Sequence, residues 1–185
     1  AKLAESGPMD VSQVLNELTG VAIVENQFGT GAELSGFDAD HILVLVDGME
    51  LVGRTNGQLD ISQIPTDQIE RIEVVKGASS ALYGSEAMGG IINIITKEPQ
   101  KDFKISFGGD AGSYGRYNGN MTLSGGLGDW KSKVYFNARR YGGNDLSNSS
   151  LWENGSSYKK YNTGLRFENE NFVSGIFRLD TKIFW

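Results

Sequence analysis

Few residues in this sequence are of the types that carry out chemistry. The chain contains no cysteine, which excludes disulfides, thiolate metal sites and thiol catalysis. Its single histidine is His41, and one histidine without a Gly-x-Ser-x-Gly motif supports neither a zinc site nor a nucleophile triad. We therefore predict no catalytic residue, no metal ligand, no cofactor and no enzymatic activity.

The charge balance argues against another class of protein. The 185 residues carry 17 basic and 23 acidic side chains, which gives a formal net charge of -6. Proteins that bind nucleic acid present a basic face, so we expect no nucleic-acid partner. The 25 glycines suit tight turns and close backbone contacts better than long helices.

Two helices and a helical turn are predicted in the first half of the chain. Apolar residues recur at helical spacing over residues 11–18, with Asp10 as the cap and Gly20 as the end of the helix. A second helix is predicted to start with Thr66 as its N-cap, followed by Ile69 as the first buried residue. Residues 79–83 have the pattern of a short helical turn.

Short aliphatic runs predict the strands of the same region. They fall at residues 21–25, 41–47, 70–76 and 91–96. Asp47 and Gly48 form a turn pair after the second of them. The third alternates charged with aliphatic side chains, and its charged residues are Glu70, Arg71, Glu73 and Lys76. Helices and strands together predict a small mixed α/β domain.

The residue types change near residue 100, where aromatic, glycine, asparagine and serine residues replace the aliphatic runs. The new pattern has a period of two, which predicts antiparallel strands with one apolar and one polar face. Val134 and Phe136 illustrate the apolar face, and Lys133 and Asn137 the polar face. The predicted strands are residues 103–111, 117–124, 130–139, 161–167 and 172–185, with residues 168–171 as a short turn.

This period leaves two architectures open. No apolar run approaches the ~20 residues of a membrane-spanning helix, but β-barrels cross membranes with alternating strands. Short turns alternate here with a long polar loop at residues 142–160, as they do in outer-membrane barrels. A soluble sandwich with apolar inner faces has the same period, so periodicity alone favours neither architecture.

Three ordered blocks resemble the plug domain of TonB-dependent outer-membrane receptors. They are residues 40–48 (DHILVLVDG), 61–77 (ISQIPTDQIERIEVVKG) and 78–97 (ASSALYGSEAMGGIINIITK). Residues 9–15 and the pair Gly20-Val21 also fit the family's first plug helix and the strand after it. The resemblance covers about residues 6–97, whereas the later strands match the family only in style.

The resemblance implies an α+β plug domain, a small mixed sheet with short helices, at residues 1–97. A linker at 98–102 would lead to antiparallel strands of an incomplete transmembrane β-barrel at 103–185. Relatives have an apolar TonB box near the N-terminus and about 22 barrel strands. We therefore expect the box, the first plug strand and most of the barrel to be missing from this sequence. Leu34-Ser35-Gly36 replaces the family's usual Ile-Arg-Gly, whose arginine commonly locks plug to barrel.

The resemblance also implies roles for particular residues. Ligand contacts are expected from the plug apex and the long loop, at Arg54, Thr55, Asn56, Gln58, Trp152 and Tyr158. Contacts between plug and barrel are expected from Glu70, Arg71, Glu73 and Lys76, opposite residues such as Lys131, Lys133 and Arg139. An ordinary half-exposed strand face is the alternative for these charges. Structural turns are expected at Gly48, Gly77, Gly84, Gly89 and Gly90, and a structural hydrogen bond at His41.

The function implied is active nutrient uptake across the outer membrane of a Gram-negative bacterium. A ferric siderophore, haem or cobalamin would bind at the surface, and the plug would gate the pore. TonB, with its inner-membrane proton-motive complex, would drive opening, and outer-membrane lipid would surround the barrel. Lys76-Gly77-Ala78-Ser79 favours this branch over the starch-uptake branch, which usually has Lys-Asp-Ala-Ser. The alternative is a surface receptor or adhesin that binds a ligand without transport.

Overall fold

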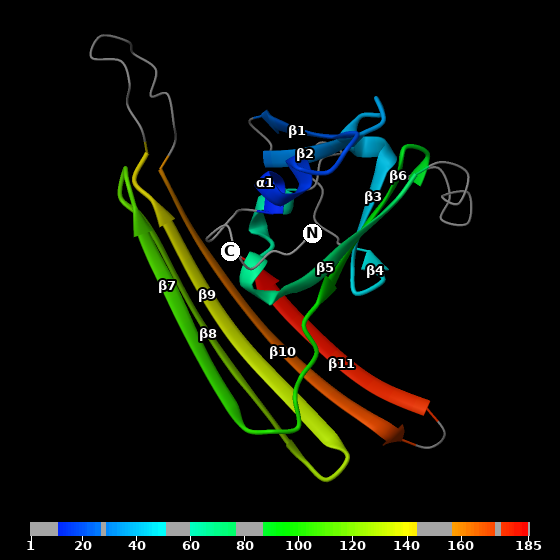
Figure 1. Cartoon of the computed structure of the whole chain (residues 1–185), viewed down its shortest axis with the longest axis vertical. Helices are drawn as coiled ribbons and strands as arrows, with labels where there is room; N and C mark the ends of the chain where they lie inside the picture. Colours follow the sequence, from blue (N-terminus) through cyan, green and yellow to red (C-terminus); the bar gives the residue numbers. More distant parts are fainter. Residues whose placement is uncertain are drawn as a thin grey trace. The chain divides into compact units, whose positions relative to one another are not determined.

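The computed structural model describes residues 11–26, 29–50, 60–76, 87–143, 157–172 and 175–184. The chain divides into two compact units, Ala1–Lys97 and Glu98–Trp185 (Figure 1). Within the described ranges, no helix has the length and apolarity needed to cross a membrane. The predicted cap at residue 10 and the predicted helical turn at residues 79–83 lie outside the described residues.

The first unit combines two small sheets with short helical segments. Its elements are α1 (Val11–Asn16), β1 (Val21–Asn26), β2 (Gly29–Leu34), η1 (Ala39–His41), β3 (Ile42–Val46), β4 (Met49–Glu50), η2 (Ile61–Gln63), η3 (Thr66–Gln68), β5 (Ile69–Val75) and β6 (Gly90–Thr96). β1 and β2 form an antiparallel pair. The other four strands form a sheet of order β4-β3-β6-β5, in which β3 and β6 run parallel and the outer pairs run antiparallel.

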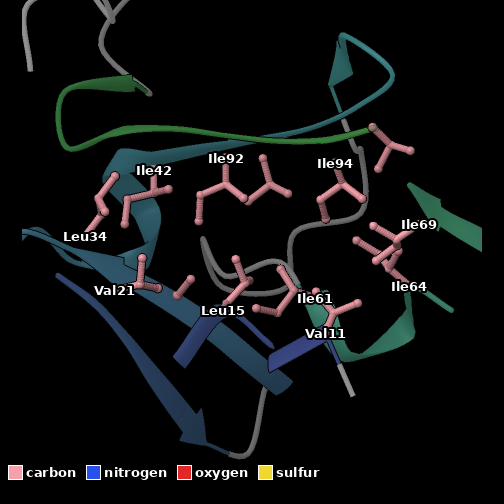
Figure 2. Packing of buried hydrophobic residues seen from close by; sticks show 13 residues of the cluster. Val11, Leu15, Val21, Leu34, Ile42, Ile61, Ile64, Ile69, Ile92 and Ile94 are labelled. Carbon is pink, nitrogen blue, oxygen red and sulfur yellow. The ribbon is translucent and has the colours of Figure 1, made fainter. Parts of the chain in front are cut away.

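Aliphatic side chains from both sheets and from α1 meet in one core (Figure 2). Alternate residues of β3 point to opposite sides, so Ile42, Val44 and Val46 enter this core, whereas Leu43 and Leu45 join a second cluster. All five are buried, which explains the unbroken aliphatic run in the sequence. The predicted apolar helix face is confirmed, because Val11, Val14 and Leu15 of α1 are buried and Leu18 packs against the core.

The predicted helix at residues 11–18 is two residues too long. α1 ends at Asn16, and the N–H of Leu18 donates to the carbonyl of Leu15 at 3.0 Å, a tighter i to i−3 bond. Gly20 then adopts a φ of 79°, and the chain enters β1 at once. The left-handed backbone at this point favours glycine, which explains why Gly20 follows the helix.

One further prediction for this unit is wrong, and one strand was not predicted. Thr66 is the first residue of η3, a single 3-10 turn. The turn ends at Gln68 because Ile69 begins β5. The cap position is Pro65, which offers no side-chain hydrogen bond. Strand β2 was not predicted, because two glycines within Gly29–Leu34 hide the alternation that a strand usually shows.

The second unit is an antiparallel sheet of long neighbouring strands. They are β7 (Lys104–Gly112), β8 (Arg116–Leu127), β9 (Trp130–Tyr141), β10 (Tyr158–Phe172) and β11 (Gly175–Phe184). Each pairs with the next along the chain, in the order β11-β10-β9-β8-β7. A short turn at Gly128 and Asp129, with φ of 61° at the glycine, joins β8 to β9.

The predicted turn at residues 168–171 is wrong, because these residues continue β10. Glu168 lies opposite Lys131 and Asn169 opposite Trp130, so the ladder with β9 continues past the predicted end of the strand. Glu168 has a side-chain exposure of only 5%. Glu168 is therefore a residue of the polar face of a long strand, although its polarity had predicted a turn.

The faces of this sheet have the reverse of the usual burial. On β9, Lys133, Tyr135 and Asn137 are buried, whereas Val134 and Phe136 are exposed at 42% and 46%. We call these two sides the polar face and the apolar face. A soluble sandwich would bury the apolar face, and monomeric soluble proteins rarely expose apolar patches this extensive. Of the two architectures left open by the sequence, the structure supports the wall of a membrane barrel.

Candidate functional site

The plug-apex residues Arg54, Thr55, Asn56 and Gln58 fall in the segment 51–59, outside the described residues. The structure does describe both ends of this segment. β3 and β4, which precede it, are joined by Asp47 and Gly48, with φ of 54° and 79°. Two successive left-handed residues make the tight hairpin turn that Asp-Gly favours, so Gly48 occupies a position that needs its conformational freedom.

Asp47 fastens this hairpin to the end of β6. Its Oδ1 accepts the N–H of Thr96 at 2.8 Å, and its Oδ2 accepts the Oγ1 hydroxyl of Thr96 at 2.8 Å. The N–H of Asp47 donates to the carbonyl of Ile94 at 2.9 Å. The entrance to segment 51–59 is therefore fixed to the last residues of the plug sheet.

Asp60 fastens the other end of the segment to β2 and η2. Its Oδ1 accepts the N–H groups of Thr30 and Ser62, both at 3.2 Å, and the hydroxyl of Ser62 at 2.5 Å. Gly29, with φ of 127°, packs so closely on Asp60 that an added Cβ would lie 2.7 Å from the Cβ of Asp60. Sequence analysis identified Asp47 only as part of the Asp-Gly turn pair and did not single out Asp60, although Asp-x-Ser is the local signal that identifies it.

The charged residues of β5, and Lys76 directly after it, make hydrogen bonds within the first unit. Arg71 donates from Nε to Glu73 at 2.8 Å and from Nη1 to Glu70 at 3.2 Å. The hydrogen bond to Glu73 raises the pKa of the Arg71 guanidinium. Lys76 donates from Nζ to the carbonyl of Thr19 at 2.5 Å. Our expectation that Glu70, Arg71, Glu73 and Lys76 contact the barrel stays a prediction.

Two of the other predicted structural glycines are described, and both lie against neighbouring backbone. An added Cβ at Gly89 would lie 3.2 Å from the carbonyl oxygen of His41, which also accepts the Gly89 N–H at 2.9 Å. Gly90 has φ of 140°, and a Cβ there would lie 2.7 Å from the Val75 carbonyl oxygen. Gly77 and Gly84 are outside the described residues. The side chain of His41 pairs with Asp40, Nδ1 to Oδ1, at 2.8 Å.

The polar face of β9 and β10 is built from directly opposed pairs. Tyr158, a predicted ligand contact, lies opposite Tyr141 with ring centroids 5.6 Å apart, at the strand ends that border residues 144–156. The next pair on this face is Arg139 and Lys160, and the Lys160 Nζ lies 5.0 Å from the centre of the Tyr158 ring. Trp152, the other predicted contact in this region, is outside the described residues.

Amides and further charges follow along the same face. Asn162 lies opposite Asn137 and donates to it at 3.5 Å, and Asn137 donates to Asn118 at 3.1 Å. Lys133 and Arg166 come two pairs further on. Polar side chains therefore line this face over the length of the strands, as the lumen of a membrane barrel requires.

Comparison with known proteins agrees with this arrangement of a plug-like unit and a barrel-like wall. Residues 1–91 match the TonB-dependent Receptor Plug Domain. The chain is 38% identical over 121 residues to the vitamin B12 transporter BtuB of Photobacterium profundum, a match that covers 64% of this chain and 20% of that protein. The chain thus spans about a fifth of the length of this curated relative.

Solved structures extend the likeness to the strands of the second unit. The siderophore receptor PirA of Acinetobacter baumannii matches with a TM-score of 0.76 and 23% identity, over 94% of this chain and 28% of that one. The pyoverdine receptor FpvA of Pseudomonas aeruginosa PAO1 matches with a TM-score of 0.74 and 20% identity, over 93% and 24%. At these identities the likeness shows the fold. The chain belongs to the TonB-dependent receptors of the Gram-negative outer membrane, a family of transport receptors.

Proposed function

We propose that this chain forms the plug and the first wall strands of a receptor that takes up a scarce nutrient by active transport. Residues 1–97 would act as the plug and residues 103–185 as barrel wall. The observation that carries the proposal is the polar, partly charged face of a sheet whose other face is apolar and exposed. Such a wall separates lipid from an aqueous lumen, and a lumen that admits a nutrient needs a gate.

Residues 98–102 would join plug to wall, and their contacts with the wall support this role. The N–H of Gln100 donates to the hydroxyl of Ser124 at 2.8 Å, and the Lys101 carbonyl accepts the N–H of Gly126 at 2.8 Å. The segment is therefore hydrogen-bonded to the end of β8. Because this connection is anchored to the wall, the plug could rearrange while the wall strands keep their positions.

The proposed substrate is a ferric siderophore, haem or cobalamin, and the proposed energy-supplying partner is TonB with its proton-motive complex. The relative BtuB is a vitamin B12 transporter, PirA is a siderophore receptor and FpvA is a pyoverdine receptor. Transport of this kind needs no covalent step, so we propose no enzymatic activity. Tyr158 and Tyr141, flanked by Arg139 and Lys160, are the described side chains that we propose as substrate contacts on the wall.

Uptake measured with and without TonB tests this function. The intact receptor would be expressed in a strain that lacks its own receptors and supplied with labelled ferric siderophores, haemin or cyanocobalamin. We expect saturable uptake of one of these substrates, lost when TonB is deleted. Binding without uptake in a strain that has TonB would support the surface receptor or adhesin, and uptake that persists without TonB would contradict the transport mechanism.

A further inference from the structure

In the described strands β7 to β10, the apolar face carries charge in one row only. This face contains every second residue of the four strands. The ranges are Ile105 to Ala111, Tyr117 to Leu127, Trp130 to Arg140 and Lys159 to Phe167. Among these positions the only charged residues are Arg140 and Lys159. They lie directly opposite one another, and Tyr117 lies opposite Arg140 on the other side.

This row lies at one border of the apolar region. Exposed apolar side chains occupy much of the rest of the face, and they are Ile105, Phe107, Met121, Leu123, Leu127, Trp130, Val134 and Phe136. The ten steps from Tyr117 to Leu127 extend about 33 Å at ~3.3 Å each. Strands tilted by about 40° would then span roughly 25 Å, the height of the apolar band of an outer-membrane barrel. Arg140 and Lys159 are therefore placed at the level of the lipid headgroups.

The neighbours of the pair suit the same position. Tyr117, exposed at 57%, lies in the same row as the pair. Tyr161, exposed at 36%, lies in the next row toward the apolar region. Aromatic side chains of this kind border the apolar band of membrane barrels. The row also lies at the end of β9 and β10 that borders the long polar connection, which in such barrels is the extracellular end.

Two opposed cations favour the binding of an anion between them. Like charges directly opposite on antiparallel strands repel, because their Cβ atoms are only about 5 Å apart. No acidic residue occupies the described apolar-face positions of β7 to β10, so the sheet itself supplies no carboxylate on this side. A phosphate oxygen cluster bridges guanidinium and ammonium groups at this spacing.

We propose that Arg140 and Lys159 bind a phosphate group of a phosphorylated outer-leaflet lipid. The apolar residues below the pair take the acyl chains, and the two cations take the headgroup. This site is on the opposite side of the sheet from the proposed substrate contacts, and it does not depend on which nutrient the receptor carries. A phosphorylated lipid held here fixes the depth and rotation of this part of the wall in the membrane.

Native mass spectrometry of the intact receptor in detergent tests the site, with bisphosphorylated lipid A titrated as the probe. The variant is Arg140→Gln with Lys159→Gln. The matched control is Arg139→Gln with Lys160→Gln, which removes the same charge from the adjacent residues on the polar face. Each cation near an anionic lipid contributes about fivefold in affinity, so the variant is expected to bind lipid A about 25-fold more weakly and the control no more weakly than wild type.

Three further measurements separate the possible outcomes. Lipid A without its phosphates is expected to bind the wild type as weakly as the phosphorylated form binds the variant. Inorganic phosphate is expected not to compete at millimolar concentration, because it lacks the acyl chains. Arg140→Lys with Lys159→Arg keeps both charges and is expected to retain binding. Equal losses in the variant and its control, unchanged binding in the variant, or equal binding of dephosphorylated lipid A would overturn the proposal.

Discussion

Lys133 lies directly opposite Arg166 on β9 and β10, and both residues are buried, with exposures of 4% and 2%. Like charges directly opposite one another destabilise a strand pair. Burial adds to this cost, because the two charged groups lose their hydration. Glu168 offsets this arrangement, since its Oε1 lies 3.9 Å from the Arg166 Nη1 and its residue lies opposite Lys131. The carboxylate of Glu168 thus supplies a counter-charge to this cationic part of the polar face.

Replacing that carboxylate should destabilise the wall. We expect Glu168→Gln to lower the free energy of unfolding by about 3 kcal/mol, near the lower end for breaking a buried ion pair because 3.9 Å is a long contact. Urea unfolding of the intact receptor, followed by tryptophan fluorescence, measures the change. Asp129→Asn in the exposed β8–β9 turn is the control, and a loss as large there would contradict the role given to Glu168.

The link between Asp47 and Thr96 should be detectable residue by residue. Asp47→Ala removes both acceptors and places alanine at a φ of 54°, so we expect a loss of about 2 kcal/mol and faster amide exchange at Thr96. Asp47→Asn keeps one acceptor oxygen and tolerates the left-handed backbone, so its effect should be smaller. Hydrogen exchange with mass spectrometry of the peptide that contains Thr96 reports this order, and unchanged protection in Asp47→Ala would refute it.

Gly164 and Tyr135 should behave as a coupled pair. They lie opposite one another on β10 and β9, and a Cβ added to Gly164 would overlap the Tyr135 ring. Gly164→Ala is expected to cost about 2 kcal/mol through overpacking. In a double-mutant cycle, Tyr135→Ala removes the ring and should abolish most of that cost. Additive effects of the two substitutions on urea unfolding would show that the ring does not occupy this space.

Tyr158 should affect substrate binding more than folding. Tyr158→Ala is expected to weaken binding of the transported compound about tenfold, because the ring contributes contact area beside Tyr141. Tyr158→Phe keeps the ring and should bind within about twofold of wild type if stacking is the main contribution. Calorimetric titration with the substrate identified by uptake measures both, and Arg140→Gln on the apolar face is the control. Wild-type affinity in Tyr158→Ala would remove this residue from the proposed contacts.

Much of the plug sheet could be predicted from local sequence, because its strands are short and continuously aliphatic. β3, β5 and β6 were placed within a residue or two, and Asp47 with Gly48 marked the hairpin. β2 was not predicted because glycine and threonine weaken its alternation of apolar and polar residues. The strand is stabilised by pairing with β1 and by the hydrogen bond to Asp60. Such contacts join residues 30 positions apart, which no local pattern reveals.

The sequence correctly predicted which residues share a face of each strand, but it could not predict which of the two faces is buried. Period-two alternation assigns Lys133 and Phe136 to opposite faces, yet it does not say which face meets lipid. Only the exposure of the aromatic side and the burial of the cationic side distinguish a membrane wall from a sandwich. The row formed by Arg140 and Lys159 was likewise hidden, because their opposition depends on the register across a connection of more than a dozen residues.

The orientation of the second unit in the membrane is the claim on which the whole account depends. Spin labels can be attached to the intact receptor through single cysteines introduced into this part of the chain, which contains no cysteine. With the receptor in lipid bilayers, labels at Val134 and Phe136 should be accessible to dissolved oxygen and shielded from a water-soluble nickel chelate. A label at Asn137 should be shielded from oxygen. Oxygen accessibility that does not alternate along β9, or that is highest at Asn137, would contradict a barrel wall with its polar face toward the lumen.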